Sequence, residues 1–230
     1  MKWPKVSLDA IKAPARYSFV GGPFGSNLTT RDYVEEGVPV IRGNNLPAHS
    51  TFLDDDFVFV KEQKAESLTS NLAHAGDLVF TQRGTLGQVG MIPPEPRFPT
   101  YVISQSQMKL TVDPDKADAR FIYFYFRSPA TVQSVINHAL TSGVPHINLG
   151  ILKRFEVPLP PLAEQRRIAE VLTAYDGLME NNRRRMALLE AAARQLYAEW
   201  FVRLRFPRER GVTSGEWRVA SGEWRVASGE

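Results

Sequence analysis

The sequence contains no cysteine among its 230 residues, which excludes disulfide bonds, thiolate nucleophiles and cysteine zinc sites. Its four histidines are scattered without the spacing of metal ligands: His49, His74, His138 and His146. No apolar run approaches the roughly 20 residues that cross a bilayer, and the N-terminus does not resemble a signal peptide. We therefore expect a soluble, cytoplasmic protein with no metal site and no membrane segment.

Motifs of catalysis are also missing. The sequence has no Walker motif, no nucleophile elbow, no dinucleotide-binding loop, and no Asn-Pro-Pro-aromatic or Asp-Pro-Pro-aromatic tetrapeptide of the amino-methylating enzymes. The acidic stretches at residues 54–56 and 113–115 have the residue types of a metal site, but such stretches are more often solvated turns. This favours a non-catalytic recognition component that holds no cofactor of its own.

The charge of the chain is nearly balanced, with a formal net charge of +3 at pH 7. Basic and acidic residues almost cancel over residues 1–160, and the excess of arginine follows in residues 161–210. A chain with this balance does not bind nucleic acid as a general polycation. If it binds nucleic acid, locally placed cations and hydrogen-bonding groups must do so.

One long helical pattern dominates the second half of the sequence, from Leu162 to about Leu204. Pro160 and Pro161 suit a first turn, and Glu164 lies near the positive end of the helix dipole. Apolar residues then recur with alternating gaps of four and three, which is a heptad seam, and at about 1.5 Å per residue this seam is a rod of roughly 50 Å. The seam comprises Ile168, Leu172, Tyr175, Met179, Asn182, Met186, Leu189, Ala193, Leu196 and Trp200.

A rod with one apolar stripe needs a surface to lie against. One alternative is the chain's own domain, and the other is a second long helix from another subunit or another copy. Asn182 favours the second helix, because a polar residue in a seam fixes register and partner number. We therefore expect this helix to mediate dimerisation and the docking of a partner.

The first part of the chain is expected to form a compact, β-rich core. Strands are predicted at residues 38–42, 57–60, 77–83, 89–92 and 101–112, and residues 3–8 form an edge strand or an anchoring arm. Helices are predicted from Asp118 and from the cap pair Ser128 and Pro129 to Leu140. Residues 21–28 and 141–148 are predicted loops. The expected fold class is α+β, a β-rich domain followed by a long coiled-coil-forming α-helix.

The C-terminal tail repeats a heptapeptide, since residues 215–221 recur at once as residues 222–228. Two copies are too few for a solenoid. Part of the repeat loosely echoes residues 2–7, which suggests the truncated start of a second domain of the first kind; a functionless tail is the alternative. The expected division is a domain at residues 1–157, a helical region at 158–206 and the tail at 207–230.

The segment FEVPLPPLAEQRRIA at residues 155–169 closely resembles the conserved helical region of specificity subunits of type I restriction-modification systems. Residues 21–28, 81–87 and 142–148 look like the target-recognition domain that precedes this helix in the family. The family usually carries two recognition domains and two helical regions in one chain, whereas this sequence has one of each. The resemblance therefore implies a half-length form in which two copies pair through antiparallel long helices.

The resemblance also implies what such a homodimer does. Each recognition domain would read a few base pairs of double-stranded DNA, so the target would be bipartite and an inverted repeat. Separate modification subunits, which bind S-adenosylmethionine and methylate adenine, would dock on the helices, and a motor-nuclease restriction subunit would be a further partner. Two other interpretations stay open: an adaptor that binds only proteins, and a stand-alone nuclease or methyltransferase with an unrecognised site.

Polar side chains in the glycine-bounded loops are the candidates for base contacts, and three cations are the candidates for phosphate contacts. The candidates for bases are Ser26, Asn44, Asn45, Gln82, Arg83, Gln105, Ser142, His146 and Asn148. The candidates for phosphates are Arg42, Lys109 and Lys153. For each of them the alternative is that the side chain satisfies backbone groups at a turn or strand end.

Overall fold

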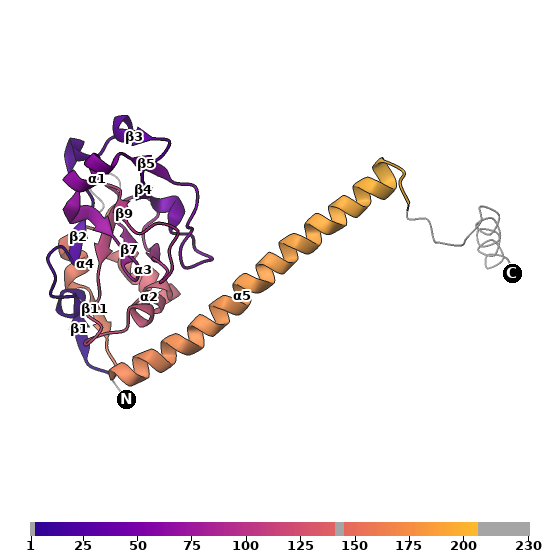
Figure 1. The fold of residues 1–230 in the computed structure, drawn as a ribbon. Coiled ribbons are helices and arrows are strands. Elements are labelled where there is room, and N and C mark those ends of the chain that lie inside the picture. The colour runs from indigo at the N-terminus through magenta and orange to yellow at the C-terminus, as the bar shows by residue number, and fades with distance from the viewer. Residues whose placement is uncertain (1–2, 141–144, 207–230) are drawn as a thin grey trace, which may run out of the picture. The chain divides into compact units, whose positions relative to one another are not determined.

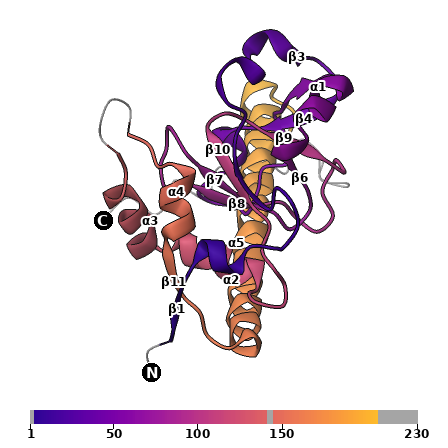
Figure 2. The same cartoon turned by 90° about the vertical axis from the view of Figure 1, so that its left-hand side faces the viewer.

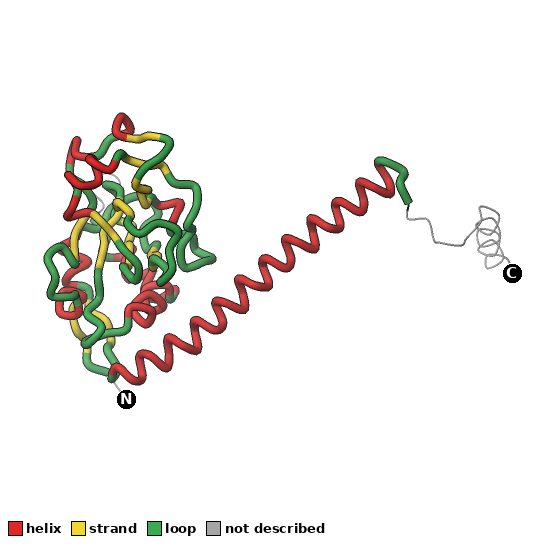
Figure 3. The backbone as a smooth tube through the Cα atoms, viewed as in Figure 1, coloured by secondary structure: helices red, strands yellow, loops and turns green. Residues whose placement is uncertain are grey.

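The computed structural model describes residues 3–140 and 145–206 (Figure 1). Ser142 and the repeat in the tail lie outside these residues. Contacts within the chain define two compact units, Met1–Leu178 and the residues from Met179 onward. The predicted α+β class is confirmed, because short strands and helices form the first part of the chain and one long helix follows (Figure 3).

The strands are short, and most of those predicted are present. They are β1 (Lys5–Ser7), β2 (Phe19–Gly21), β3 (Tyr33–Val34), β4 (Val38–Ile41), β5 (Val58–Val60), β6 (Leu72–Ala73), β7 (Leu78–Thr81), β8 (Val89–Met91), β9 (Tyr101–Ile103), β10 (Gln107–Leu110) and β11 (Glu156–Pro158). The helices are α1 (Glu62–Ser67), α2 (Ala119–Arg127), α3 (Pro129–Asn137), α4 (Leu149–Arg154) and α5 (Leu162–Tyr197). The predictions of β4, β5, β7 and β8 are confirmed, whereas α4 and β11 were not predicted.

Within the described residues the strands form three sheets. Their orders are β1-β11, β2-β10-β7-β8 and β3-β5-β4-β9-β6. Only β4 and β9 pair in parallel among the strand pairs of these residues. The four-stranded sheet packs on α2, where the rings of Phe80 and Phe126 lie 5.0 Å apart in an edge-on contact. The aromatic side chains of α2 thus belong to the core and are no platform for bases.

The prediction of a single strand over residues 101–112 is wrong. β9 ends at Ile103 in the five-stranded sheet, and β10 begins at Gln107 in the four-stranded sheet. The chain turns between them, where the amide of Gln107 donates to the carbonyl of Ser104 at 3.1 Å. Residues 101–112 contain no glycine and no proline, so the sequence does not reveal that the chain changes sheets.

Helices α2 and α3 begin at capping side chains, of which only the Ser128 cap was predicted. The Asp118 carboxylate accepts hydrogen bonds from the amides of Arg120 at 2.9 Å and Phe121 at 3.2 Å. The Ser128 hydroxyl accepts from the amide of Thr131 at 3.3 Å, and Pro129 occupies the first position of α3. Helix α3 ends at Asn137 and not at the expected Leu140.

The N-terminal segment is a strand that holds the chain just before α5. β1 pairs antiparallel with β11, and the two lie side by side (Figure 2). The amide of Leu159 donates to the carbonyl of Pro4 at 2.8 Å, which continues this pairing. The alternative of a free anchoring arm at residues 3–8 is therefore removed.

Helix α5 begins at Leu162, as predicted, and continues to Tyr197 before a π-helical turn at Ala198–Val202. Its first turns belong to the core of the first unit, because Ala169 is fully buried and Ile168 packs beside it. In the described part of the chain, no helix combines the length and apolarity that a membrane span requires.

Candidate nucleic-acid interface

The turn between β9 and β10 is the meeting point of the predicted loops. The carbonyl of Ser106 accepts hydrogen bonds from the amides of Gln82 at 2.7 Å and Arg83 at 3.4 Å. On the other side of the turn, the Gln105 side chain donates to the carbonyls of Gly25 at 2.5 Å and Leu28 at 2.6 Å. The side chain of Gln105 therefore connects the turn at residues 104–106 to the loop at residues 21–28. The predicted contact of Gln105 with a base would compete with these hydrogen bonds.

The double glycine at residues 21–22 has a steric cause. The amide of Gly22 donates to the carbonyl of Gln107 at 2.8 Å. A Cβ atom on Gly22 would lie 2.0 Å from the carbonyl oxygen of Ser104, which is backbone and has no room to move away. Only glycine lets the loop at residues 21–28 lie this close to the turn, and Ser26 is thereby held exposed beside it.

The loop before α4 joins the same surface. The carbonyl of Gln82 accepts from the amide of Ile147 at 3.1 Å, and Arg83 and His146 form an isolated β-bridge. The Asn148 side chain accepts from the amide of Ile151 at 2.8 Å, so Asn148 caps α4 in addition to being exposed. We call residues 21–28, 82–84, 104–106 and 146–148 together the loop face.

Arg83 is the cation of the loop face. Its side chain is exposed, and within the described residues it has no acidic partner within ion-pair distance. Gly84 follows it with a φ of +96°, a conformation that glycine adopts without strain. A guanidinium that projects from a sharp turn without an internal partner is available for a bidentate contact to a base or a phosphate.

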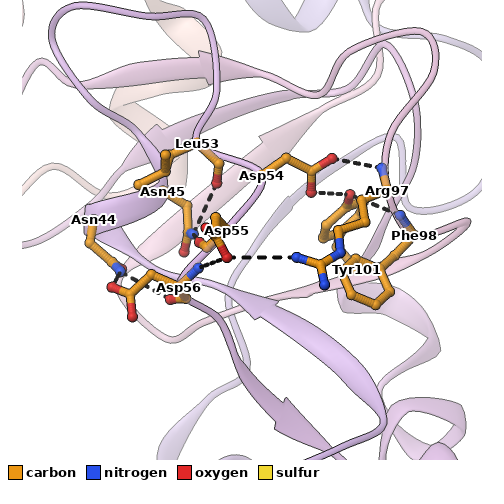
Figure 4. Close-up of polar contacts among 9 residues, drawn as sticks. All are labelled: Asn44, Asn45, Leu53, Asp54, Asp55, Asp56, Arg97, Phe98 and Tyr101. Atoms are coloured by element: carbon orange, nitrogen blue, oxygen red, sulfur yellow. Dashed lines mark hydrogen bonds and ion pairs between the residues drawn. The ribbon is translucent and has the colours of Figure 1, made fainter. Parts of the chain in front are cut away.

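A second group of candidates surrounds Asn45 (Figure 4). The Asn44 amide donates to the Asp56 carboxylate at 2.7 Å, and the Arg42 guanidinium donates to the Asp56 carbonyl at 3.3 Å. Asn45 is fully buried, and its amide donates to the carbonyls of Leu53 at 3.1 Å and Asp55 at 2.9 Å. The prediction that Asn45 contacts bases is therefore corrected: it holds the loop at residues 46–56 in place.

The acidic residues of this loop serve the fold. The Asp54 carboxylate accepts from the hydroxyl of Tyr101 and from the amide of Arg97, both at 2.6 Å (Figure 4). Burial, together with the bond to Asp54, raises the pKa of the Tyr101 hydroxyl. No cluster of three or more metal-ligating side chains occurs among the described residues. The Asp54 carboxylate is satisfied within the fold.

The two groups of candidates are neighbours. A Cβ atom on Gly43 would lie 3.7 Å from the Gln88 side chain and 3.9 Å from the Gln107 side chain. Gln107 begins β10, directly after the turn that carries Gln105. Arg42 and Asn44 are thus adjacent to the loop face and extend it.

One phosphate candidate requires correction, and another has partners within the domain. Lys109 is 6 % exposed, and its ammonium donates to the carbonyl of Leu72 at 2.6 Å and pairs with Asp77 at 3.8 Å. Burial lowers the pKa of Lys109, and Asp77 opposes that effect. Lys153 pairs with Asp9 at 3.7 Å and lies over the Phe19 ring. Lys109 is internal and cannot reach DNA, and Lys153 is held by contacts within the domain.

The predicted seam of α5 is an exposed apolar surface. Gln165 and Ala169 are buried in the first unit, but Leu172 is 38 % exposed and Tyr175 is 62 % exposed. In the second unit, Met179, Met186, Leu189 and Leu196 are also exposed, Asn182 faces solvent among them, and Trp200 is half-buried. An exposed apolar stripe of this length is typical of a protein–protein contact surface.

Arg127 connects α2 to α5 and to the loop at residues 46–56, and this role was not predicted from the sequence. Arg127, the last residue of α2, donates to the Asp176 carboxylate of α5 at 2.8 Å and to the carbonyl of Ala48 at 2.8 Å. Its only signal in the sequence is a cation at the end of an aromatic helix, directly before the Ser128 and Pro129 cap. Such a position is also common for a solvated cation at a helix C-terminus.

Comparisons with known proteins agree on one family. The family described as "Type I restriction modification DNA specificity domain" matches residues 25–191. The MjaIX specificity subunit of a type I restriction enzyme from Methanocaldococcus jannaschii is 24% identical over 143 residues, which are 62% of this chain and 32% of that protein. The chain thus spans about a third of the length of this relative.

Two solved structures share the fold. The S subunit of a type I restriction-modification system from M. genitalium superposes with a TM-score of 0.58 at 17% identity, over 97% of this chain and 50% of that chain. The HsdS subunit from Thermoanaerobacter tengcongensis gives a TM-score of 0.50 at 18% identity, over 83% of this chain and 40% of that chain. At these identities the likeness shows the fold alone.

Proposed function

Because the chain belongs to the family of type I restriction-modification DNA specificity domains, we propose that its loop face reads one half of a bipartite DNA target. The observation that carries this proposal is the convergence of loops from four parts of the sequence around the turn at residues 104–106. The expectation of a specificity component, in place of an enzyme, is confirmed by family membership. Which bases the face reads, and through which residues, is part of the proposal.

The chemistry of the loop face supports direct readout. Arg83 presents a fork of donors that matches the O6 and N7 atoms of guanine in the major groove, and Ser26 and Asn44 add adaptable polar groups. Backbone bonds among the loops hold these groups in place before DNA arrives, which lowers the entropic cost of binding. Arg42, beside this face, is the cation best placed for a phosphate contact.

The exposed seam of α5 supports the pairing of two copies. The described part of each chain has one loop face and one long helix, so two chains joined through antiparallel α5 helices would carry two loop faces. A pair related by a two-fold axis reads an inverted repeat, with an unread spacer between the half-sites. The remaining surface of the helices would receive modification subunits, which bind S-adenosylmethionine, and a motor-nuclease subunit would join that assembly.

The first experiment selects the target. We expect the purified chain to enrich, from a pool of random duplexes, sequences with two inverted half-sites at a fixed separation. A bidentate contact to guanine is worth about 1–3 kcal/mol, so Arg83→Ala should weaken binding to the selected site by about 5-fold to 150-fold. Binding to unrelated DNA should change much less.

The matched control is Lys116→Ala. Lys116 is also an exposed cation, but it follows the far end of β10, whereas the loop face adjoins the start of that strand. We expect this variant to bind the selected site like the wild type. Equal losses for Arg83→Ala on selected and unrelated DNA would assign Arg83 to phosphate, and a chain that enriches no sequence would refute the proposal.

A further inference from the structure

Arg127 joins three segments of the first unit at one point. Its guanidinium donates to the Tyr123 hydroxyl at 2.6 Å, to the Asp176 carboxylate at 2.8 Å and to the Ala48 carbonyl at 2.8 Å. It also lies over the ring of Tyr123, which is 1 % exposed. The ion pair with Asp176 is more than three-quarters buried on both sides, so solvent screens it less than a surface pair.

Asp176 is the second of two residues of α5 that form hydrogen bonds with residues at the two ends of α2, and the buried Ala169 lies between them in the sequence. The first point is Gln165, whose side-chain oxygen accepts from the amide of Asp118 at 3.0 Å at the start of α2. Asp176 lies three helical turns further along α5, about 16 Å from Gln165 along the axis. Asp176 thus extends the attachment of α5 beyond the buried turn at Ile168 and Ala169, so that a longer part of the helix is held within the first unit.

The other contacts of Arg127 reach the segments that flank the loop face. Ala48 lies in the loop that Asn45 holds, and the Tyr123 hydroxyl donates to the carbonyl of Ser50 in the same loop at 3.5 Å. Arg127 also lines a cavity of about 220 Å³, together with Pro47, Ala48, Leu86 and Gly87. The segment that follows Asn44 thus contacts Arg127 through Ala48, and the segment that follows Arg83 lines the same cavity.

We propose that Arg127 is a positioning residue that sets which separation of half-sites a pair of chains accepts. It does so by attaching about the first four turns of α5, through Asp176, to the loop at residues 46–56, which flanks the loop face. The inference rests on the proposed function, because it needs two loop faces connected by α5. It goes beyond that function, because it assigns spacer selectivity to a contact far from the bases.

Because DNA is helical, a firm attachment of α5 to the domain affects which spacer lengths a pair of chains can bind. One added base pair moves the second half-site by about 3.4 Å and rotates it by about 35°. A rigid connection between α5 and each domain therefore rejects a spacer that is one base pair too long or too short. A loose connection accommodates it, at no cost to the contacts of a single domain with its half-site.

The experiment compares two carboxylate variants of α5. Asp176→Asn removes the charge that faces Arg127 and leaves the bonds of Arg127 to Ala48 and Tyr123 in place. Glu180→Gln removes an equal charge one turn later, where the carboxylate pairs only loosely with Arg183 at 3.9 Å. Dissociation constants are measured for each variant on duplexes whose spacer varies by single base pairs, and on a duplex with one half-site.

We expect the wild type and Glu180→Gln to share one sharp spacer optimum. In Asp176→Asn the preference for that optimum over its neighbours should fall by about threefold or more, with unchanged affinity for the single half-site. Arg127→Gln should show the same flattening, and thermal melting of each variant shows that it is folded.

Two results would overturn the inference while the proposed function stands. One is a wild-type spacer profile in Asp176→Asn. The other is an equal loss of affinity at every spacer and at the single half-site, which would make the pair a support of the domain only. A wild-type chain that binds all spacers equally would refute the bipartite function itself, and this inference with it.

Discussion

The domain and the long helix use their side chains in opposite ways. In the domain, polar groups turn inward: Asn45 is 0 % exposed and Lys109 is 6 % exposed, and each has partners there. In α5, apolar groups turn outward, and Leu189 is 69 % exposed. A buried polar group stabilises a single conformation only if every partner is present, whereas an exposed apolar stripe is stabilised by a second molecule. These polar groups of the domain are therefore satisfied internally, whereas the apolar stripe of α5 is exposed, as the proposed pairing of two copies requires.

The largest effect is expected where a buried charge of the domain loses its partner. Asp77 pairs with Lys109 and accepts hydrogen bonds from the His74 amide and the Thr111 hydroxyl. Asp77→Ala leaves the Lys109 ammonium uncompensated, and we expect the free energy of unfolding in urea to fall by about 3–5 kcal/mol. The double variant Asp77→Ala/Lys109→Met should recover much of this loss; failure to recover any would show that the charge is not the cause.

The second effect tests the outward face of α5. Leu189 lies in the seam, and its neighbour Leu188 is equally exposed but lies on another side of the helix. Burying a leucine contributes about 1.5–3 kcal/mol and a pair has two copies, so Leu189→Asp should raise the dimer dissociation constant by about a hundredfold or more. Analytical ultracentrifugation measures this constant, and Leu188→Asp is the control. Equal effects of both substitutions would contradict the seam.

The third effect is a pH dependence of the free energy of unfolding. It arises at Asp118, where the domain contacts Gln165 of α5. Burial raises the pKa of Asp118, but hydrogen bonds from the Arg120 side chain and from the Phe121 amide outweigh it, and the pKa lies below its ordinary value of 3.8. A carboxylate with a lowered pKa stabilises the fold above its ordinary pKa, and this is lost as pH falls through the folded value.

Asp118→Asn keeps a capping oxygen but removes the charge. We expect it to lower the free energy of unfolding by about 1 kcal/mol at pH 7, with the difference from the wild type shrinking below about pH 4. Urea unfolding at a series of pH values measures this difference. A difference that stays constant with pH would mean that the charge does not contribute.

The smallest effect concerns the helix itself. Gly177 lies inside α5, and a Cβ atom added there meets nothing within 4 Å. Gly177→Ala should therefore stabilise the helix by up to about 1 kcal/mol, detectable as a small rise in the midpoint of thermal unfolding. A decrease would indicate that α5 needs the flexibility of glycine at this position.

The sequence predicts the long helix more completely than the arrangement of the domain's loops. The start of α5 and the cap at Ser128 follow from local periodicity and local hydrogen bonding, and both are found where predicted. The loops at residues 21–28 and 146–148 were also predicted as loops, since glycine and proline mark them. Their convergence could not be predicted, because it depends on hydrogen bonds between residues as far apart as Gln105 and Gly25.

The two wrong predictions of DNA contacts have one physical cause. Asn45 and Lys109 have residue types that suit DNA contacts, but tertiary packing places them inside with internal partners. Residue type alone does not distinguish a polar group that waits for a ligand from one that is satisfied within the fold. Arg127 was missed for the converse reason, because its three partners lie far from it in the sequence or one turn before it.

The central claim is that α5 joins two copies of the chain so that two loop faces meet one DNA molecule. Light scattering of the complex with a duplex that carries two inverted, selected half-sites tests this claim most directly. We expect two chains per duplex for the wild type and for Leu188→Asp, and fewer than two chains per duplex for Leu189→Asp at the same concentration. One wild-type chain per duplex at every spacer and concentration would contradict it.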